Sequence, residues 1–425
     1  MKRIHRLLGA VLLAACGRET PTDVGGTLLP GQSVRTFETV LDASAFLVRD
    51  TSFSGYGRPA NSTFLFVTRA RGGALESRAL LKWPVLPGVI TVRDAAGTLR
   101  ADSMPIFFGG RIKVRIDTLR SSPAPFTVRA QRATQTWDVV SATWQLRVDT
   151  GDVELPWAEP GGAPGALAGT GRYQAGNDTI TIAVDSQTIV AWRDTINVVP
   201  GAVLSMETAD AFMRTADITL EIDARSTIDT DTVVTSVTRP TESVFIFDPP
   251  VASTAADPRV GGIPVWRTYL QLLEGLDTVT VGCPDGPAGC RIPLGQVSIS
   301  YAALVFDPVA PPPGFAVEDS LQIGARLLLV DPLVPLARSP LGEAVGVMPR
   351  PLAPARFLDT TTPIEIPITE FMRRAAADSV EAAERPPPHI ALVTISELGT
   401  FGFVTFASPP RLRLLVTVAT ELQLR

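Results

Sequence analysis

Four acidic residues stand close to Trp144 and Trp157 in the sequence: Asp149, Asp152, Glu154 and Glu159. A glycosidase needs two carboxylates, which its fold brings together on either side of the bond that is cleaved. Carboxylate oxygens are also the ligands that Ca²⁺ prefers, but no loop of this chain has a recognisable calcium spacing. Because acidic residues that alternate along a strand usually form its solvated face, we expect these four to be non-catalytic.

Other catalytic chemistry has little material in this chain. The two histidines are His5 and His389, and His5 lies in a segment that we expect to be removed. His389 stands between three prolines, 386–388, and a strand-like run, so we expect it to be structural or exposed. The sequence has no G-x-S-x-G, no H-E-x-x-H and no phosphate-binding loop, and cysteine-histidine zinc sites lack ligands. We therefore predict a protein that is not an enzyme and that has neither a cofactor nor a metal.

Three tryptophans, Trp137, Trp144 and Trp157, lie in one stretch of the chain. A flat aromatic ring matches the apolar face of a sugar, while polar neighbours such as Asp152 and Glu159 satisfy its hydroxyls. The alternative, which we favour for Trp144 and also for Trp157, is that the tryptophans fill a sandwich core. Trp157 follows Pro156 and precedes a Glu-Pro-Gly-Gly loop, so it is the best candidate for an exposed sugar platform.

Cys283 and Cys290 flank the turn-forming sequence PDGPAG, with strand-like segments on both sides. Such a turn folds the chain back on itself and brings two cysteines near the distance that a disulfide requires. A metal pair would need two further soft ligands, which the chain lacks. We predict a disulfide between Cys283 and Cys290 that holds this loop in shape.

The third cysteine, Cys16, ends a short apolar run. Lys2, Arg3 and Arg6 precede this run, which is the arrangement of a secretory signal peptide and is too short to span a membrane. The sequence Leu-Ala-Ala-Cys at its end resembles the bacterial lipoprotein box. That resemblance implies cleavage of a signal peptide over residues 1–15 and attachment of fatty-acyl chains to Cys16, which together anchor a protein firmly.

Such an anchor predicts a location in the cell envelope. In lipoproteins of this kind an Asp after the cysteine favours the inner membrane, and Gly17 here favours the outer membrane or cell surface. Removal of residues 1–15 takes away three basic residues and no acidic one, so the mature chain is more acidic than the full-length net charge of −5. With no basic patch, we expect no nucleic-acid partner.

Short segments of alternating apolar and polar residues, bounded by turn formers, recur along the chain: 63–70, 111–117, 178–185 and 411–424. This pattern predicts strands, and hence an all-β protein of two jelly-roll-like antiparallel β-sandwich domains. Helices are expected at 368–384 and 206–214.

Three pairs of segments match in the same order between the two halves: 180–185 with 364–369, 77–83 with 266–272, and 216–222 with 411–417. The matches favour a duplication, and chance likeness between alternating strands is the alternative. The expected layout is a tether over 16–35, a first domain over 36–224, a linker or long edge segment over 225–242, and a second domain over 243–425.

The first half carries motifs in the order Tyr56-Gly57, then SRALLKWPVLPG over 77–88, then SATWQLRVDTGDVELPWAEPGG over 141–162. This order resembles that of DNRLRE-domain proteins, which are extracellular β-sandwich modules grouped with carbohydrate-binding modules. The resemblance implies a jelly-roll-like fold and a carbohydrate ligand.

Two functions follow as expectations from these features. The first is a non-catalytic, lipid-anchored surface protein whose sandwiches bind an extracellular glycan or cell-wall material. The second is a structural component of an envelope protein complex that contacts protein and has no carbohydrate ligand. An exposed aromatic patch with polar neighbours favours the glycan, whereas a broad apolar patch favours the protein partner.

Overall fold

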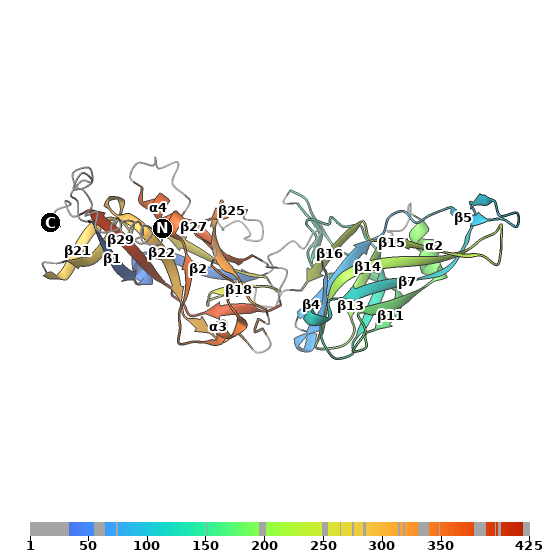
Figure 1. The fold of residues 1–425 in the computed structure, drawn as a ribbon, viewed down its shortest axis with the longest axis horizontal. Coiled ribbons are helices and arrows are strands. Elements are labelled where there is room, and N and C mark those ends of the chain that lie inside the picture. Colours follow the sequence, from blue (N-terminus) through green and yellow to red (C-terminus); the bar gives the residue numbers. More distant parts are fainter. Residues whose placement is uncertain are drawn as a thin grey trace, which may run out of the picture.

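The structure is a computed structural model. It describes residues 34–54, 64–73, 75–150, 152–194, 201–248, 254–263, 265–273, 276–283, 286–312, 315–317, 319–329, 340–347, 349–377, 388–395, 397 and 401–419. Strands dominate, helices are few and short, and the sheets are antiparallel, so the predicted all-β sandwich class is confirmed. The strands form two bodies that lie end to end in an elongated molecule (Figure 1).

Body 1, residues 64–248, is a 10-stranded sheet folded into two layers. One layer contains β3 (Phe66–Ala70), β4 (Leu75–Lys82), β8 (Thr127–Ala133), β11 (Pro164–Arg172), β13 (Gly201–Met206) and β16 (Glu242–Phe247). The other contains β7 (Ile106–Ile116), β12 (Thr179–Asp185), β14 (Ala211–Arg225) and β15 (Val233–Thr238), in the order β12-β7-β14-β15. The long strand β14 joins the layers, because its first residues pair with β3 and the rest with β7 and β15.

The core of body 1 follows from the two-residue period of its strands. Alternate residues of β7 and β14, such as Ile112, Val114 and Leu220, are fully buried and belong to one apolar cluster with Leu81 and Phe245 from the facing layer. The intervening residues of β7 and β14 are largely charged. Because side chains alternate between the two faces of a strand, this sequence buries one face of each layer and hydrates the other face of the β7–β14 layer.

Short elements complete body 1. Helix α2 (Ser186–Arg193) follows β12, and the carboxylate of Asp185 caps it by accepting the backbone N–H of Thr188 at 2.7 Å. This is the usual arrangement at a helix N-terminus. Two hairpins project from the layers: β5 (Ile90–Arg93) with β6 (Leu99–Asp102), and β9 (Leu146–Asp149) with β10 (Glu154–Pro156).

Body 2 contains two sheets around a second apolar core. The smaller has the order β1-β29-β22-β26, from β1 (Val34–Leu41), β22 (Ser298–Phe306), β26 (Ile364–Pro367) and β29 (Arg411–Ala419). The larger contains β2 (Leu47–Ser54), β17 (Thr254–Ala255), β18 (Arg259–Gly261), β19 (Trp266–Leu272), β23 (Pro308–Val309), β24 (Ile323–Leu328), β25 (Leu341–Ala344), β27 (His389–Thr394) and β28 (Phe403–Phe406). Helices α3 (Pro354–Leu358) and α4 (Thr369–Ala376) and the hairpin of β20 (Thr278–Cys283) and β21 (Gly286–Pro293) complete it.

The first strands of the chain belong to body 2, although the sequence predicted a first domain that begins near residue 36. β1 pairs with β29 and β2 pairs with β19. Pairing between strands so distant in sequence is set by the tertiary fold and leaves no local signal. Body 2 is therefore residues 34–54 together with 254–419.

Of the two alternatives for residues 225–242, a linker or a long edge segment, the second fits, because residues 233–238 form the edge strand β15, which pairs with β14 in body 1. The expected helix over 206–214 is instead the end of β13 and the start of β14. Ala211, Met213 and Thr215 are all buried, which is a two-residue period. The expected helix over 368–384 is confirmed over 369–376 as α4, and its last part lies outside the described residues.

The two bodies share one plan, which supports the predicted duplication. The layer order β12-β7-β14-β15 of body 1 matches β26-β22-β29-β1 of body 2, and a short helix follows both β12 and β26. In the facing layers, β8-β13-β4-β16 matches β24-β27-β19-β2. The hairpin β5–β6 between β4 and β7 in body 1 matches the hairpin β20–β21 between β19 and β22 in body 2. All three segment matches found in the sequence fall on equivalent strands.

The equivalence has one irregularity. The strand pair β15–β16 completes body 1, but the equivalent pair β1–β2 of body 2 comes from the beginning of the chain.

Among the described helices, none is long and apolar enough to cross a membrane.

Candidate binding surfaces

The three predicted sugar-platform tryptophans are buried. Trp137, Trp144 and Trp157 are 7%, 8% and 5% exposed, respectively. They pack on the outward face of β4, β13 and β16 in an apolar cluster with Leu80, Val203, Val244 and Ile246. We call Trp137, Trp144 and Trp157 the tryptophan cap. Of the two alternatives for these tryptophans, a sugar platform or a sandwich core, burial in an apolar cluster fits the core, and Trp157 is not an exposed ring. This sheet is apolar on both faces and needs a cover on its outer side.

Polar contacts fix the tryptophan cap to the sheet. The indole N–H of Trp157 donates to the carbonyl of Thr143 at 2.9 Å. Arg78 of β4 lies 4.8 Å from the centre of the Trp144 ring and donates to the carbonyl of Gly161 at 2.9 Å. Gly161 has a φ of +87°, and a Cβ there would lie 2.8 Å from the Arg78 guanidinium. Glycine is therefore required where the loop crosses this arginine.

The acidic residues near the tryptophan cap lie on the small β9–β10 hairpin and the loop after it. Asp149 is buried and stands opposite Glu154 in the hairpin, and Ser141 accepts the Asp149 backbone N–H at 3.0 Å. Asp152, Glu154 and Glu159 are exposed. Within the described ranges, no three His, Cys, Asp or Glu side chains are grouped to hold a metal ion.

The remaining predicted residues have the following places. His389 begins β27, and its Nδ1 lies 2.6 Å from the hydroxyl of Tyr269, so it makes a hydrogen bond within a sheet. Cys290 lies on β21 opposite Val281, and Cys283 on β20 stands opposite Gly286, so the two cysteines lie on the two paired strands of one hairpin. The side chain of Cys283, residues 1–33 with Cys16, and Tyr56-Gly57 lie outside the described residues.

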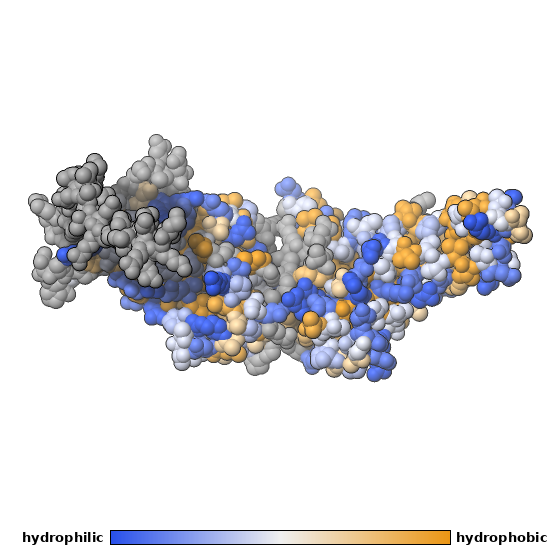
Figure 2. Space-filling view, viewed as in Figure 1, coloured by the Kyte–Doolittle hydropathy of each residue, from blue (hydrophilic) through white to orange (hydrophobic). Residues whose placement is uncertain are grey.

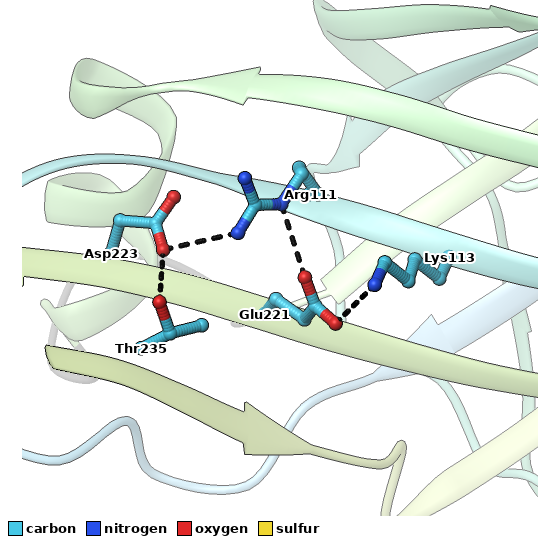
Figure 3. A network of polar contacts seen from close by, with 5 residues as sticks. All are labelled: Arg111, Lys113, Glu221, Asp223 and Thr235. Atoms are coloured by element: carbon cyan, nitrogen blue, oxygen red, sulfur yellow. Dashed lines mark hydrogen bonds and ion pairs between the residues drawn. The ribbon is translucent and has the colours of Figure 1, made fainter.

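A ladder of charged side chains covers the outer face of the β7–β14–β15 layer (Figure 3). Arg111 donates to Glu221 at 3.0 Å and to Asp223 at 3.2 Å, and Lys113 lies 2.6 Å from Glu221. Hydrogen bonds from Lys113 and then Arg111 lower the pKa of Glu221. Because each cation is matched by a carboxylate on the neighbouring strand, this face offers no concentrated charge to a polyanion.

A cavity of about 180 Å³ opens between β14 and the turn that joins β15 to β16. Phe64, Leu65, Leu81 and Ile218 give it apolar walls. At its rim Arg239 contacts both carboxylate oxygens of Asp217 at 3.2 Å, which lowers the pKa of Asp217. The cavity is smaller than the usual pocket for a drug-sized ligand, and is of a size to receive one side chain or a small molecule.

Exposed apolar side chains gather at the end of body 1 that points away from body 2. Figure 2 shows them at the end of the molecule where Figure 1 places β5. They come from the β5–β6 hairpin and the start of β7: Val89, Leu99, Met104, Ile106 and Phe108, which are 50%, 60%, 76%, 58% and 46% exposed, respectively. We call these five residues the tip surface. Exposed apolar patches on a protein surface often mark interaction sites.

A buried carboxylate holds the tip surface in place. Asp102, at the end of β6, accepts hydrogen bonds from the backbone N–H of Met104 and from the N–H and hydroxyl of Thr227, and a further one from the Ser226 hydroxyl. Burial acts to raise the pKa of Asp102, but these hydrogen bonds outweigh burial and hold it at about 2. Asp102 thereby ties the hairpin to the loop between β14 and β15.

Sequence reasoning overlooked the tip surface, although a signal was present. Residues 104–108 read Met-Pro-Ile-Phe-Phe. The run is apolar at consecutive positions, and a strand buried on one face can cover only every second one. Phe107 is buried and Ile106 and Phe108 are exposed.

No known protein-family model matches this chain, and no curated protein matches it.

Proposed function

We propose that this chain is a non-catalytic, lipid-anchored envelope protein that binds a protein partner through the tip surface. The tip surface carries the proposal. Methionine and aromatic side chains such as Met104 and Phe108 are enriched in protein interfaces, and several exposed apolar side chains side by side are costly in water unless a partner covers them.

The arrangement of the bodies supports the same function. β1 is the first described strand, and it lies in body 2, whereas the tip surface lies at the far end of body 1 (Figure 1). Cys16 precedes β1 in the chain. A lipid on Cys16 would therefore hold body 2 near the outer membrane and present the tip surface away from it.

A glycan ligand would require a platform other than Trp137, Trp144 and Trp157, because these rings pack on the sheet. In this proposal the resemblance to DNRLRE-domain modules concerns the fold of body 1 and not its ligand. We favour a protein partner over cell-wall carbohydrate. The proposed disulfide between Cys283 and Cys290 would stabilise the β20–β21 hairpin of body 2, and alkylation of the non-reduced protein followed by mass spectrometry tests it.

Cross-linking from a single position tests the proposed partner. A photoreactive amino acid is placed at Met104 in living cells, and a matched copy carries it at Leu358, which is 53% exposed on α3 of body 2. We expect discrete protein adducts from Met104, several-fold stronger than from Leu358, that disappear with Phe108→Ser. Equal adducts from both positions, or a glycan array on which the soluble protein binds specific sugars while Met104 gives no adduct, would overturn the proposal.

Fatty-acid labelling tests the anchor separately. We expect a labelled protein that becomes unlabelled in Cys16→Ala, and unchanged labelling in that variant would contradict lipidation at this residue.

A further inference from the structure

The segment 34–54 comprises β1 and β2, and both strands pair with strands from the later part of body 2, residues 254–419. All eight residues of β1 stand opposite residues of β29, from Val34 with Ala419 to Leu41 with Leu412. β2 pairs with β19 over seven positions and with β17 over two. We call residues 34–54 the donor segment.

The side chains of the donor segment also find their partners in body 2. Phe46 is 1% exposed in the core of body 2, and its carbonyl accepts the N–H of Leu273 at 2.7 Å. Ser52 is buried and lies 2.9 Å from the hydroxyl of Thr268. At the outer face Glu38 contacts Arg413 at 2.8 Å. The surface that recognises the donor segment is therefore present in full on body 2 of any copy of the chain.

The duplicated plan shows that this position in the fold is filled by a strand pair in both bodies. In body 1 the pair β15–β16 follows β14 directly and joins β14 and β4. In body 2 nothing described after β29 takes that place, and the donor segment fills it from the other end of the chain. Most of body 2 comes from residues 254–419. The strand pair that completes it comes from residues 34–54, and all of body 1 lies between these two segments in the sequence.

We propose that the donor segment is exchangeable, and that body 2 of one copy takes the donor segment of a second copy of this chain. Strands added at a sheet edge gain affinity from main-chain hydrogen bonds, and the exchange of identical elements between protomers replaces every contact with the same contact. The closed monomer is favoured by the effective concentration of its own donor segment, so the exchanged form grows as the concentration of copies rises.

Interchain disulfide trapping with the full-length chain tests this proposal. Thr36 and Thr417 stand directly opposite each other on β1 and β29, with their hydroxyls 3.1 Å apart. Two differently tagged copies, one with Thr36→Cys and one with Thr417→Cys, are co-expressed. A chain with both substitutions reports that this pair can form a bond. A second pair at Glu38 and Leu415, which are opposite in the same register, repeats the test.

We expect a disulfide-linked dimer of the two tagged copies that rises with expression level. In a control, the two copies carry Thr36→Cys and Thr235→Cys. Thr235 lies on β15, the edge strand of body 1 that is equivalent to β1, and its partner strand is β14. The dimer from the Thr36→Cys and Thr417→Cys copies should exceed the dimer from this control at least tenfold. The proposal is overturned if the doubly substituted chain closes its own bond while the separate copies give no more dimer than this control, for either pair and at every expression level.

Discussion

Body 1 and body 2 build the same layers from differently arranged chain. In body 1 one continuous strand, β14, runs through both layers, whereas body 2 uses two strands, β28 and β29, in the same places. Pro409 and Pro410 separate β28 from β29, and proline has no N–H to donate to a ladder. The continuous strand makes the layers of body 1 one hydrogen-bonded sheet, while those of body 2 are held mainly by packing between two sheets.

The bodies also differ in what covers the outer face of their larger layer. In body 1 the tryptophan cap covers β4, and Arg78 is fixed between Glu76 and the carbonyl of Gly161. In body 2 the matching strand β19 carries Arg267, which binds both oxygens of Glu397 at 2.7 Å, above a small cluster around Tyr269. An arginine recurs at the matched position, and its partners differ.

A third difference lies at the turn between the paired edge strands. In body 2 a short 3₁₀ turn, Ala43–Ala45, leads to Phe46, which is buried in the core. In body 1 the turn between β15 and β16 contains Arg239 and Pro240, and the cavity of about 180 Å³ opens there. The same fold therefore leaves a recess in body 1 at a turn where body 2 uses a phenylalanine. Body 1 is complete within one stretch of chain, and body 2 depends on the donor segment.

Deletion of residues 34–54 should have the largest effect and should separate the bodies. We expect body 2 to lose cooperative folding, since two strands and Phe46 leave its core, whereas body 1 stays folded. Hydrogen exchange is the measurement: the amides of β19 and β29 should exchange rapidly and those of β7 slowly. A protein truncated only before residue 34 is the control. Persistent protection of β29 would show that body 2 does not need the donor segment.

Phe46→Ala should destabilise body 2 by about 3–5 kcal/mol, the usual cost of truncating a buried aromatic side chain. Trp266 is the single tryptophan of body 2 in the sequence, so its fluorescence in denaturant reports this unfolding when the other five are replaced by phenylalanine in both proteins compared. The control Val40→Ala, at a position 51% exposed on the same segment, should stay within about 0.5 kcal/mol. Equal effects of the two variants would contradict the buried role of Phe46.

Trp157→Phe should cost about 1–2 kcal/mol more in body 1 than Trp83→Phe. Both substitutions remove the same atoms from a buried indole, but Trp157 also loses a hydrogen bond to the Thr143 carbonyl, which would be left without its donor. The indole N–H of Trp83 has no hydrogen-bond partner among the described residues. Urea denaturation of each variant measures the difference. A larger cost for Trp83→Phe would show that the hydrogen bond contributes little to the tryptophan cap.

Asp102→Asn should have the smallest and most local effect, a loosening of the tip surface. Folding lowers the pKa of Asp102 to about 2 from an ordinary 3.8, so its contribution is complete above about pH 4 and is lost as the pH falls toward 2. The protection factors of the Met104 and Thr227 amides, measured against the intrinsic exchange rate at each pH, should fall over that range in the wild type. In Asp102→Asn these protection factors should be low from the start, with those of β4 and β13 unchanged. A Met104 protection factor that stays constant between pH 4 and 2 in the wild type would contradict this role.

Much of the fold was predictable because it depends on local pattern. The two-residue alternation in 111–117, 178–185 and 411–424 identified strands that the structure contains as β7, β12 and β29. The helix over 369–376 follows from its composition and the preceding strand. The matches between halves fall on equivalent strands because each position makes the same demand for burial in both bodies.

The binding residues were less predictable. An apolar ring such as Trp157 fits a sugar platform and a second core equally well in sequence, and only the tertiary structure shows that the outer face of β4, β13 and β16 is apolar and covered. The tip surface needs the same information, since the exposure of Ile106 and Phe108 depends on what packs beside them.

The sequence by itself determined that this chain forms antiparallel strands with one face buried, because side-chain periodicity and turn residues act over a few neighbours. Its segment matches favoured two copies of one plan, which the strand order then supported. Only the tertiary structure decided which sheet each edge strand joins. The hydrogen-bonding groups at a strand edge are the same for every partner, so nothing local in residues 34–54 distinguishes β29 from β14. The choice is made by distant contacts such as Phe46 in the core of body 2 and Ser52 beside Thr268.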